Sequence, residues 1–142
     1  MTSTTSEPKV FFDMNVLVYA LDKHDGAKQG QCRDLLREAA ESDRGVISTQ
    51  VMQEFYVVTT RKLGLDPLVA KGVLTSFELF EVVTIVPTMI SAAIDTSVLQ
   101  QLSFWDALIV VAAESASCAR LVTDDLTHGQ VIRGVQVVNP FA

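Results

Sequence analysis

The sequence predicts one α/β domain in which a mainly parallel β-sheet is covered by helices on both faces. Short runs rich in β-branched and aromatic residues alternate with longer segments whose apolar residues recur at helical spacing. Parallel strands need crossover connections, which are usually helices, and these helices bury both faces of the sheet. With 142 residues, 49% of them hydrophobic and 20% charged, the chain has the size and composition of one globular domain.

The chain is expected to begin its fold with a strand and two helices. The apolar run Lys9–Phe12 predicts a short buried strand, and a helix over Val16–Leu21 opens directly behind it. A second helix is expected over Lys28–Glu41 because its apolar residues fall on one face. That face consists of Cys32, Leu35, Leu36 and Ala39.

The middle of the chain predicts a strand followed by two more helices. Val46–Ser48 is the second expected strand, and Thr49–Lys62 is expected to continue from it as a helix. Gly64 and Pro67 end that helix, since glycine favours the helix C-terminus and proline cannot continue the hydrogen-bonding pattern. Leu68–Phe80 is predicted to be a further helix.

The last part of the chain predicts three strands and two helices. Val82–Val86 is a β-branched run, and the apolar residues of Met89–Val98 recur at helical spacing. Phe104–Ala116 is apolar on nearly all sides, which predicts a central, buried helix. Leu121–Thr123 and Val135–Val138 are the last expected strands, which gives about five strands in all.

Residues 1–8 are polar and are expected to form a flexible tail before a single domain over residues 9–142. They show no basic start followed by an apolar block, so no secretory signal is expected. The most apolar helical stretch, Ala107–Ala113, is too short to cross a bilayer. A cytoplasmic protein without a membrane partner is therefore expected, with Cys32 and Cys118 as free thiols.

The net charge of −6 argues against an extended basic surface of the kind that binds long duplex nucleic acid. It does not exclude a small acidic site that holds a metal, because a bound cation reverses the local field. Arginines and lysines are available to flank such a site, and most are expected to be ordinary solvated charges. They are Arg33, Arg37, Arg44, Arg61, Lys62, Lys71, Arg120 and Arg133.

Four carboxylates follow or interrupt hydrophobic runs, at strand ends or inside apolar helices. They are Asp13, Glu54, Asp106 and Asp125. An ionised carboxylate buried without a partner costs several kcal/mol or more, so a fold rarely keeps one there without a use. No matching basic cluster accompanies these acids, which suggests a divalent metal ion as the missing positive charge. In parallel sheets ligands bind at the carboxyl ends of the strands, where Asp13 and Asp125 are expected.

Each acid also has a purely structural interpretation. Asp13 can belong to a turn in which Asn15 caps the next helix, and Glu54 lies at the border of an apolar helix face. Asp106 stands three residues after Ser103, as in a capping box.

The fourth acid stands beside another aspartate in a turn, and spacing leaves open whether Asp124 or Asp125 enters the site. The two histidines, His24 and His128, are expected to be surface residues rather than ligands.

Together the acids predict one kind of chemistry. Ligand sets made only of oxygen suit hard cations such as Mg²⁺ or Mn²⁺ rather than zinc. Carboxylates around such ions are commonly used to hydrolyse phosphodiesters, since the ion activates water and neutralises charge in the transition state. Without metal the acids repel one another, and at least one pKa should rise.

Four segments make the chain resemble the PIN-domain ribonucleases, and specifically the VapC-type toxins of prokaryotic toxin–antitoxin pairs. They occur in the family's order and at its spacing, and they are Phe12–Ala20, Ser48–Phe55, Leu102–Ile109 and Leu121–Gly129. The resemblance implies a three-layer α/β/α fold around a parallel sheet and Mg²⁺- or Mn²⁺-dependent endonucleolytic cleavage of RNA. It also implies a homodimer inhibited by an antitoxin whose C-terminal segment lies in the active-site groove.

The resemblance assigns roles to individual residues. Asp13, Glu54 and Asp106 match the three shared acids, and the family's T-x-D pattern places the fourth at Asp125, next to Asp124. The small polar residues that line such sites are matched by Asn15, Ser103 and Thr123. Met14 departs from the family, where a small or hydroxyl residue is frequent, and this affects the wall of the pocket rather than the ligands.

Other function classes fit less well. A phosphatase of the haloacid dehalogenase type usually has a second aspartate two residues after the first, where this chain has Asn15, and no suitably placed lysine follows. A response-regulator-like domain lacks its expected lysine near the last strand. A non-catalytic PIN-like module that binds RNA or protein remains the alternative, and metal binding separates it from a nuclease.

Overall fold

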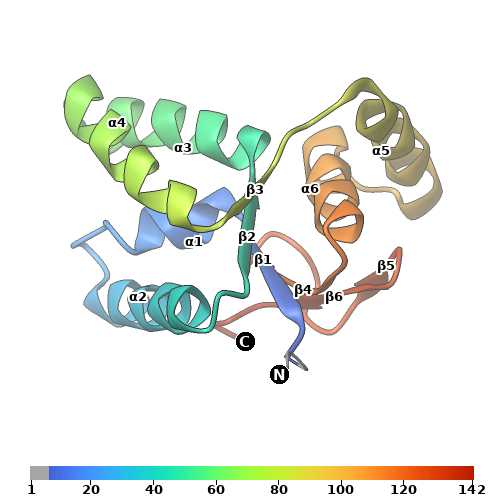
Figure 1. Ribbon diagram of the computed structural model, residues 1–142, viewed down its shortest axis with the longest axis horizontal. Helices are drawn as coiled ribbons and strands as arrows, with labels where there is room; N and C mark the ends of the chain where they lie inside the picture. The colour runs from blue at the N-terminus through green and yellow to red at the C-terminus, as the bar shows by residue number, and fades with distance from the viewer. Residues whose placement is uncertain (1–6) are drawn as a thin grey trace.

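The computed structural model describes residues 7–142, so the predicted tail over residues 1–8 lies almost wholly outside the described residues. Its centre is a six-stranded sheet in the order β3-β2-β1-β4-β6-β5 (Figure 1). All neighbouring strands are parallel except β5 and β6, which are antiparallel. The strands are β1 (Lys9–Phe12), β2 (Gly45–Ser48), β3 (Glu81–Val83), β4 (Cys118–Val122), β5 (Val131–Ile132) and β6 (Val135–Val138).

Helices flank this sheet on both sides, as the sequence predicts. In Figure 1, α1 to α4 lie on one side of the sheet, and α5 and α6 lie on the other. The helices are α1 (Met14–Tyr19), α2 (Gly26–Glu41), α3 (Thr49–Arg61), α4 (Pro67–Ser76), α5 (Pro87–Gln100) and α6 (Phe104–Ser115), with a short 3₁₀ helix η1 (Phe77–Leu79). The predicted α/β fold with a mostly parallel central sheet is confirmed.

Helix α6 packs across the middle of the sheet, where it contacts β2, β4 and β6. Every residue from Ala107 to Ala113 is buried, which confirms the prediction of a central helix. The sheet side of this core is equally apolar, because Phe11, Ile47 and Leu121 are fully buried. Burial of this kind, at about 25 cal/mol per Å² of apolar surface, is what fixes α6 against the sheet.

Several boundaries differ from the sequence prediction. Asp13, rather than Asn15, caps α1, because its carboxylate accepts a hydrogen bond from the N–H of Met14. The predicted helix over Leu68–Phe80 is divided into α4 and η1. Strand β5 was not predicted, so the sheet has six strands rather than about five. A two-residue strand carries no periodic signal that a sequence can show.

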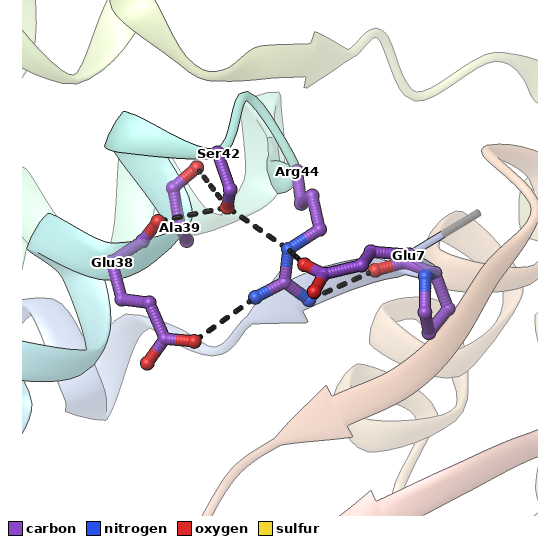
Figure 2. Close-up of polar contacts among 6 residues, drawn as sticks. Glu7, Glu38, Ala39, Ser42 and Arg44 are labelled. Carbon is purple, nitrogen blue, oxygen red and sulfur yellow. Dashed lines mark hydrogen bonds and ion pairs between the residues drawn. The ribbon is translucent and has the colours of Figure 1, made fainter. Parts of the chain in front are cut away.

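Arg44 ties the start of the described chain to the end of α2 (Figure 2). Its guanidinium contacts the carboxylates of Glu7 and Glu38 at 3.1 and 3.3 Å and donates hydrogen bonds to the carbonyl of Pro8 and the hydroxyl of Ser42. Because Arg44 directly precedes β2, this cluster lies at the amino end of the strands. The cluster therefore has a structural role, and Arg44 does not flank the acids at the carboxyl ends of the strands.

Within residues 7–142, no single helix is long and apolar enough to cross a membrane. Helices α5 and α6 reach that length and hydrophobicity only as a pair bent by 118°.

Candidate active site

The four predicted acids all lie toward the carboxyl ends of the central strands. Asp13 follows β1 and Asp125 follows β4, and these strands are adjacent, with Phe12 paired to Val122. Helix α3 starts directly after β2 and carries Glu54 in its second turn. Helix α6 leads back into β4, so its first turn, with Asp106, lies at the same end of the sheet.

Asp13 is the most deeply buried of the four acids, with 6% of its surface exposed. Its two carboxylate oxygens accept hydrogen bonds from the N–H of Met14 at 2.6 Å and the hydroxyl of Thr123 at 2.7 Å. Burial, and after it the negative charges of Asp125 and Glu54, raise the pKa of Asp13 to about 7, although the two hydrogen bonds lower it. Asp13 is therefore partly protonated near neutral pH unless a cation compensates its charge.

Asn15 connects the two neighbouring aspartates after β4. Its side-chain amide donates to Asp124 Oδ1 at 3.1 Å and to Asp125 Oδ2 at 3.0 Å. Asp124 also accepts a hydrogen bond of 2.7 Å from the hydroxyl of Tyr19. The N–H of Asp125 donates to the hydroxyl of Thr123 at 3.1 Å, so Thr123 joins Asp125 to Asp13.

Asp124 and Asp125 have different surroundings. The pKa of Asp125 is raised by partial burial and by the charges of Asp124 and Asp106, while the charge of Asp125 in turn raises the pKa of Asp13 and Glu54. Asp124 instead has its second oxygen bound by Tyr19. Asp125 is thus the member of the pair that faces the other acids.

Glu54 and Asp106 form the other side of the site. Glu54 is half-buried, and its pKa is raised by burial and then by the charges of Asp106 and Asp125, against a hydrogen bond from Gln50. The N–H of Asp106 donates to Ser103 Oγ at 3.1 Å, so Ser103 caps α6 as predicted. This hydrogen bond joins Ser103 to the main chain of Asp106 and not to its carboxylate.

The chemistry of this donor set fits a hard divalent cation. Neighbouring acidic charges raise the pKa of Asp13, Glu54 and Asp125, and the groups that lower these pKa values are not basic side chains. Within residues 7–142, however, no three Asp, Glu, His or Cys side chains are close enough together, as they stand, to bind one ion.

Two residues at the site were not singled out in the sequence. Tyr19 binds Asp124, and Gln50 binds Glu54 and donates to the carbonyl of Trp105 at 3.2 Å. The sequence contained a signal for each of these residues. Tyr19 lies four residues after Asn15, and Gln50 lies four residues before Glu54, and this spacing places two side chains on the same face of a helix. His24 and His128 are exposed, as predicted, and bind Asp22 and the N–H of Asn139.

Known structures share this fold. The toxin VapC20 of Mycobacterium tuberculosis, which cleaves the sarcin–ricin loop, matches with a TM-score of 0.67 and 17% identity over 80% of this chain and 87% of that one. A toxin–antitoxin complex from Klebsiella pneumoniae matches with a TM-score of 0.69 and 18% identity over 93% and 98% of the two chains. VapBC2 from Rickettsia felis, bound to a promoter DNA fragment, matches with a TM-score of 0.64 and 19% identity over 90% and 96%.

A comparison with curated proteins finds no significant match. The family model of the PIN domain matches residues 10–132, which include every predicted acid of the site. The sequence match and the structural neighbours, which are VapC toxins and their complexes with antitoxins, agree. The chain therefore belongs to the PIN domain family.

Proposed function

We propose that this protein is a metal-dependent endoribonuclease and the toxin of a toxin–antitoxin pair. The observation that carries the proposal is that Asp13, Glu54, Asp106 and Asp125 lie at one end of the sheet, where none of them forms an ion pair with a basic side chain of residues 7–142. Acids arranged in this way lower the stability of the metal-free protein, and a bound divalent cation would reverse that cost.

Mg²⁺ or Mn²⁺ would be held by the four acids. When bound, such an ion lowers the pKa of a water molecule that it holds, and it neutralises the negative charge that develops on the phosphate. The chain's own residues orient the ligands: Thr123 fixes one oxygen of Asp13, and Asn15 fixes one oxygen of Asp125. Asp124 and Tyr19 hold Asn15 and its neighbours in place from outside.

The structural neighbours supply the expected partners. Relatives crystallised as toxin–antitoxin complexes support an antitoxin for this chain, and RNA is its proposed substrate. Large apolar side chains are exposed on α3, α4 and α5, and such patches are typical of protein interfaces. They are Tyr56, Val57, Leu68, Val69, Ile90, Ile94, Val98 and Leu99. A homodimer and an antitoxin would each cover part of this surface, and the cytoplasm is the proposed location.

One observation favours a second candidate function, a non-catalytic module that binds RNA or protein. Among residues 7–142, no three of the acids stand close enough together to bind one ion. A nuclease must bring them together on the metal, whereas a binding module need not. The two functions therefore differ in their response to Mg²⁺ or Mn²⁺.

Cleavage of total cellular RNA by purified, antitoxin-free protein tests the nuclease. We expect discrete fragments with Mg²⁺ or Mn²⁺, none with EDTA, and a loss of at least about 100-fold in rate for Asp106→Asn, since one ligand charge disappears. The matched control is Asp95→Asn, which makes the same change at an exposed position of α5 and should cut like the parent. Equal cleavage by Asp106→Asn and the parent would contradict the assignment of the site.

A further inference from the structure

An open recess lies directly beside the acids, between α1, α3 and α6. Its volume is about 330 Å³, which is within the range of small-ligand sites. Its lining is largely apolar, with two amide side chains and one acid. The lining residues are Met14, Gln50, Gln53, Glu54, Val57, Val58 and Trp105.

The recess is continuous with the acid site. Glu54 belongs to both, Met14 follows Asp13 in the chain, and Trp105 precedes Asp106. When a phosphate of a substrate lies at the acids, the nucleotides next to it therefore lie either over this recess or on the side away from it.

Trp105 lines this recess and contributes an aromatic side chain to it. Trp105 is 59% exposed, although the residues of α6 from Ala107 to Ala113 are buried. The ring of Phe104 packs edge-on against it, with centroids 5.1 Å apart. The main chain at Trp105 is held as well, since its carbonyl accepts the hydrogen bond from Gln50. Such an exposed and braced aromatic ring is suited to stacking.

Gln50 adds an unused polar group to the same wall. The residue is 3% exposed, and its Oε1 is a buried oxygen without a hydrogen-bond partner among the described residues. A buried polar atom without a partner costs about 1–3 kcal/mol, so a donor supplied by a ligand would be stabilising there. The exposed amide of Gln53 offers a further donor and acceptor.

We propose that this recess binds one unpaired nucleobase of single-stranded RNA, stacked on Trp105 and hydrogen-bonded by the amides of Gln50 and Gln53. The inference rests on the proposed ribonuclease function and adds a base-binding subsite to it. Unpaired bases are typically recognised by aromatic stacking together with hydrogen bonds to their edges. The net charge of −6 favours this mode, because attraction of phosphates to an acidic chain is weak and stacking of bases does not depend on the net charge.

The chain offers a direct probe, since Trp105 is its only tryptophan. The fluorescence of Asp125→Asn protein, in which the cleavage site is impaired, is titrated in Mg²⁺ with four homopolymeric RNA hexanucleotides and with an abasic backbone of the same length. We expect saturable quenching by at least one hexanucleotide and much weaker quenching by the abasic backbone. No quenching by any RNA, or equal quenching by the abasic backbone, would overturn the proposal. So would quenching by a basic, leucine-rich peptide alone, because the recess would then be a peptide site.

Cleavage kinetics give the second test. Loss of one stacked base corresponds to about 5- to 150-fold in binding, so Trp105→Ala should raise KM by that factor and leave Mn²⁺ affinity unchanged. Trp105→Phe should retain most of the binding, and Leu79→Ala, at an equally exposed position of η1, is the matched control. An unchanged KM in Trp105→Ala would contradict the subsite and leave the nuclease intact. If the protein cuts no RNA at all, the fluorescence titration still decides whether the recess binds bases.

Discussion

At the scale of single residues, the site depends on how each carboxylate is held. Asp13 is fixed by two hydrogen bonds, and Asp125 is joined to it through Thr123. The sequence predicted the four acids from their position at strand ends or inside apolar helices, and the structure places them toward the same end of the sheet. The sequence did not show whether Asp124 or Asp125 faces the others, since that depends on the hydrogen bond from Tyr19 on a distant helix.

Asp13→Asn should stabilise the metal-free protein in a pH-dependent way. The pKa of Asp13 is raised from 3.8 to about 7 in the folded state, so its contribution to stability is fully present below about pH 4 and is lost as pH rises through 7. Asparagine removes this dependence and should raise the free energy of unfolding in EDTA by on the order of 2 kcal/mol near pH 8.

The free energy of unfolding of both proteins is measured in urea at about pH 4 and about pH 8. These two values lie at the start and beyond the end of the pH range over which Asp13 titrates. The parent should lose stability relative to the variant between the two pH values. If the free energies of unfolding of the parent and the variant differed by the same amount at both pH values, the pKa of Asp13 would not be raised in the folded state.

Tyr19→Phe tests the role of a residue that acts only through its neighbours. Removal of the hydroxyl frees one oxygen of Asp124 and loosens Asn15, so Mn²⁺ affinity should fall by about tenfold with little change in folding. Tyr56→Phe, on the exposed face of α3, is the control and should bind Mn²⁺ like the parent. Calorimetric titration with Mn²⁺ measures both, and equal affinity in the two variants would remove Tyr19 from the site.

At the scale of secondary-structure elements, the sequence predicted most of what the structure shows. Long periodic segments such as α2 and α6 were found because their apolar faces extend over several turns. Strand β5 was missed, and the helix over Leu68–Phe80 was predicted as continuous although it changes to η1 at Phe77. Strand β5 pairs with the nearby β6 across the turn at Arg133 and Gly134, but two residues are too short to show a period. The change to η1 accompanies packing of Phe77 against Phe55 of α3, which the local pattern does not show.

Gly45→Ala should destabilise the protein because Phe80, the residue after η1, approaches β2 closely at this glycine. A Cβ atom at Gly45 would collide with the ring of Phe80, and the ring belongs to the core. Overpacking of this kind costs about 1–3 kcal/mol in the free energy of unfolding.

Gly30→Ala is the control, since α2 has open space at that position and alanine favours a helix by about 0.5–1 kcal/mol. Thermal unfolding should show a lower Tm for Gly45→Ala and an equal or higher Tm for Gly30→Ala. An unchanged Tm for Gly45→Ala would mean that the Phe80 ring moves aside freely.

At the scale of the whole molecule, sheet topology creates the site. Strands β1 and β4 are separated by more than 100 residues in the chain but are adjacent in the sheet, which places Asp13 beside Thr123 and Asp125. Strand order cannot be read from local sequence, so the contacts between these residues were not predictable from it. Only the general rule that ligands bind at the carboxyl ends of parallel strands pointed to this edge.

Mn²⁺ binding to the metal-free protein, measured by calorimetric titration, tests most directly whether the four acids form one metal site. We expect saturable binding by the parent and by Asp95→Asn, and a loss of at least about tenfold in affinity for both Asp13→Asn and Asp106→Asn, because each removes a ligand charge. Failure of the parent to bind Mn²⁺, or equal affinity in all four proteins, would contradict the account and favour the non-catalytic binding module.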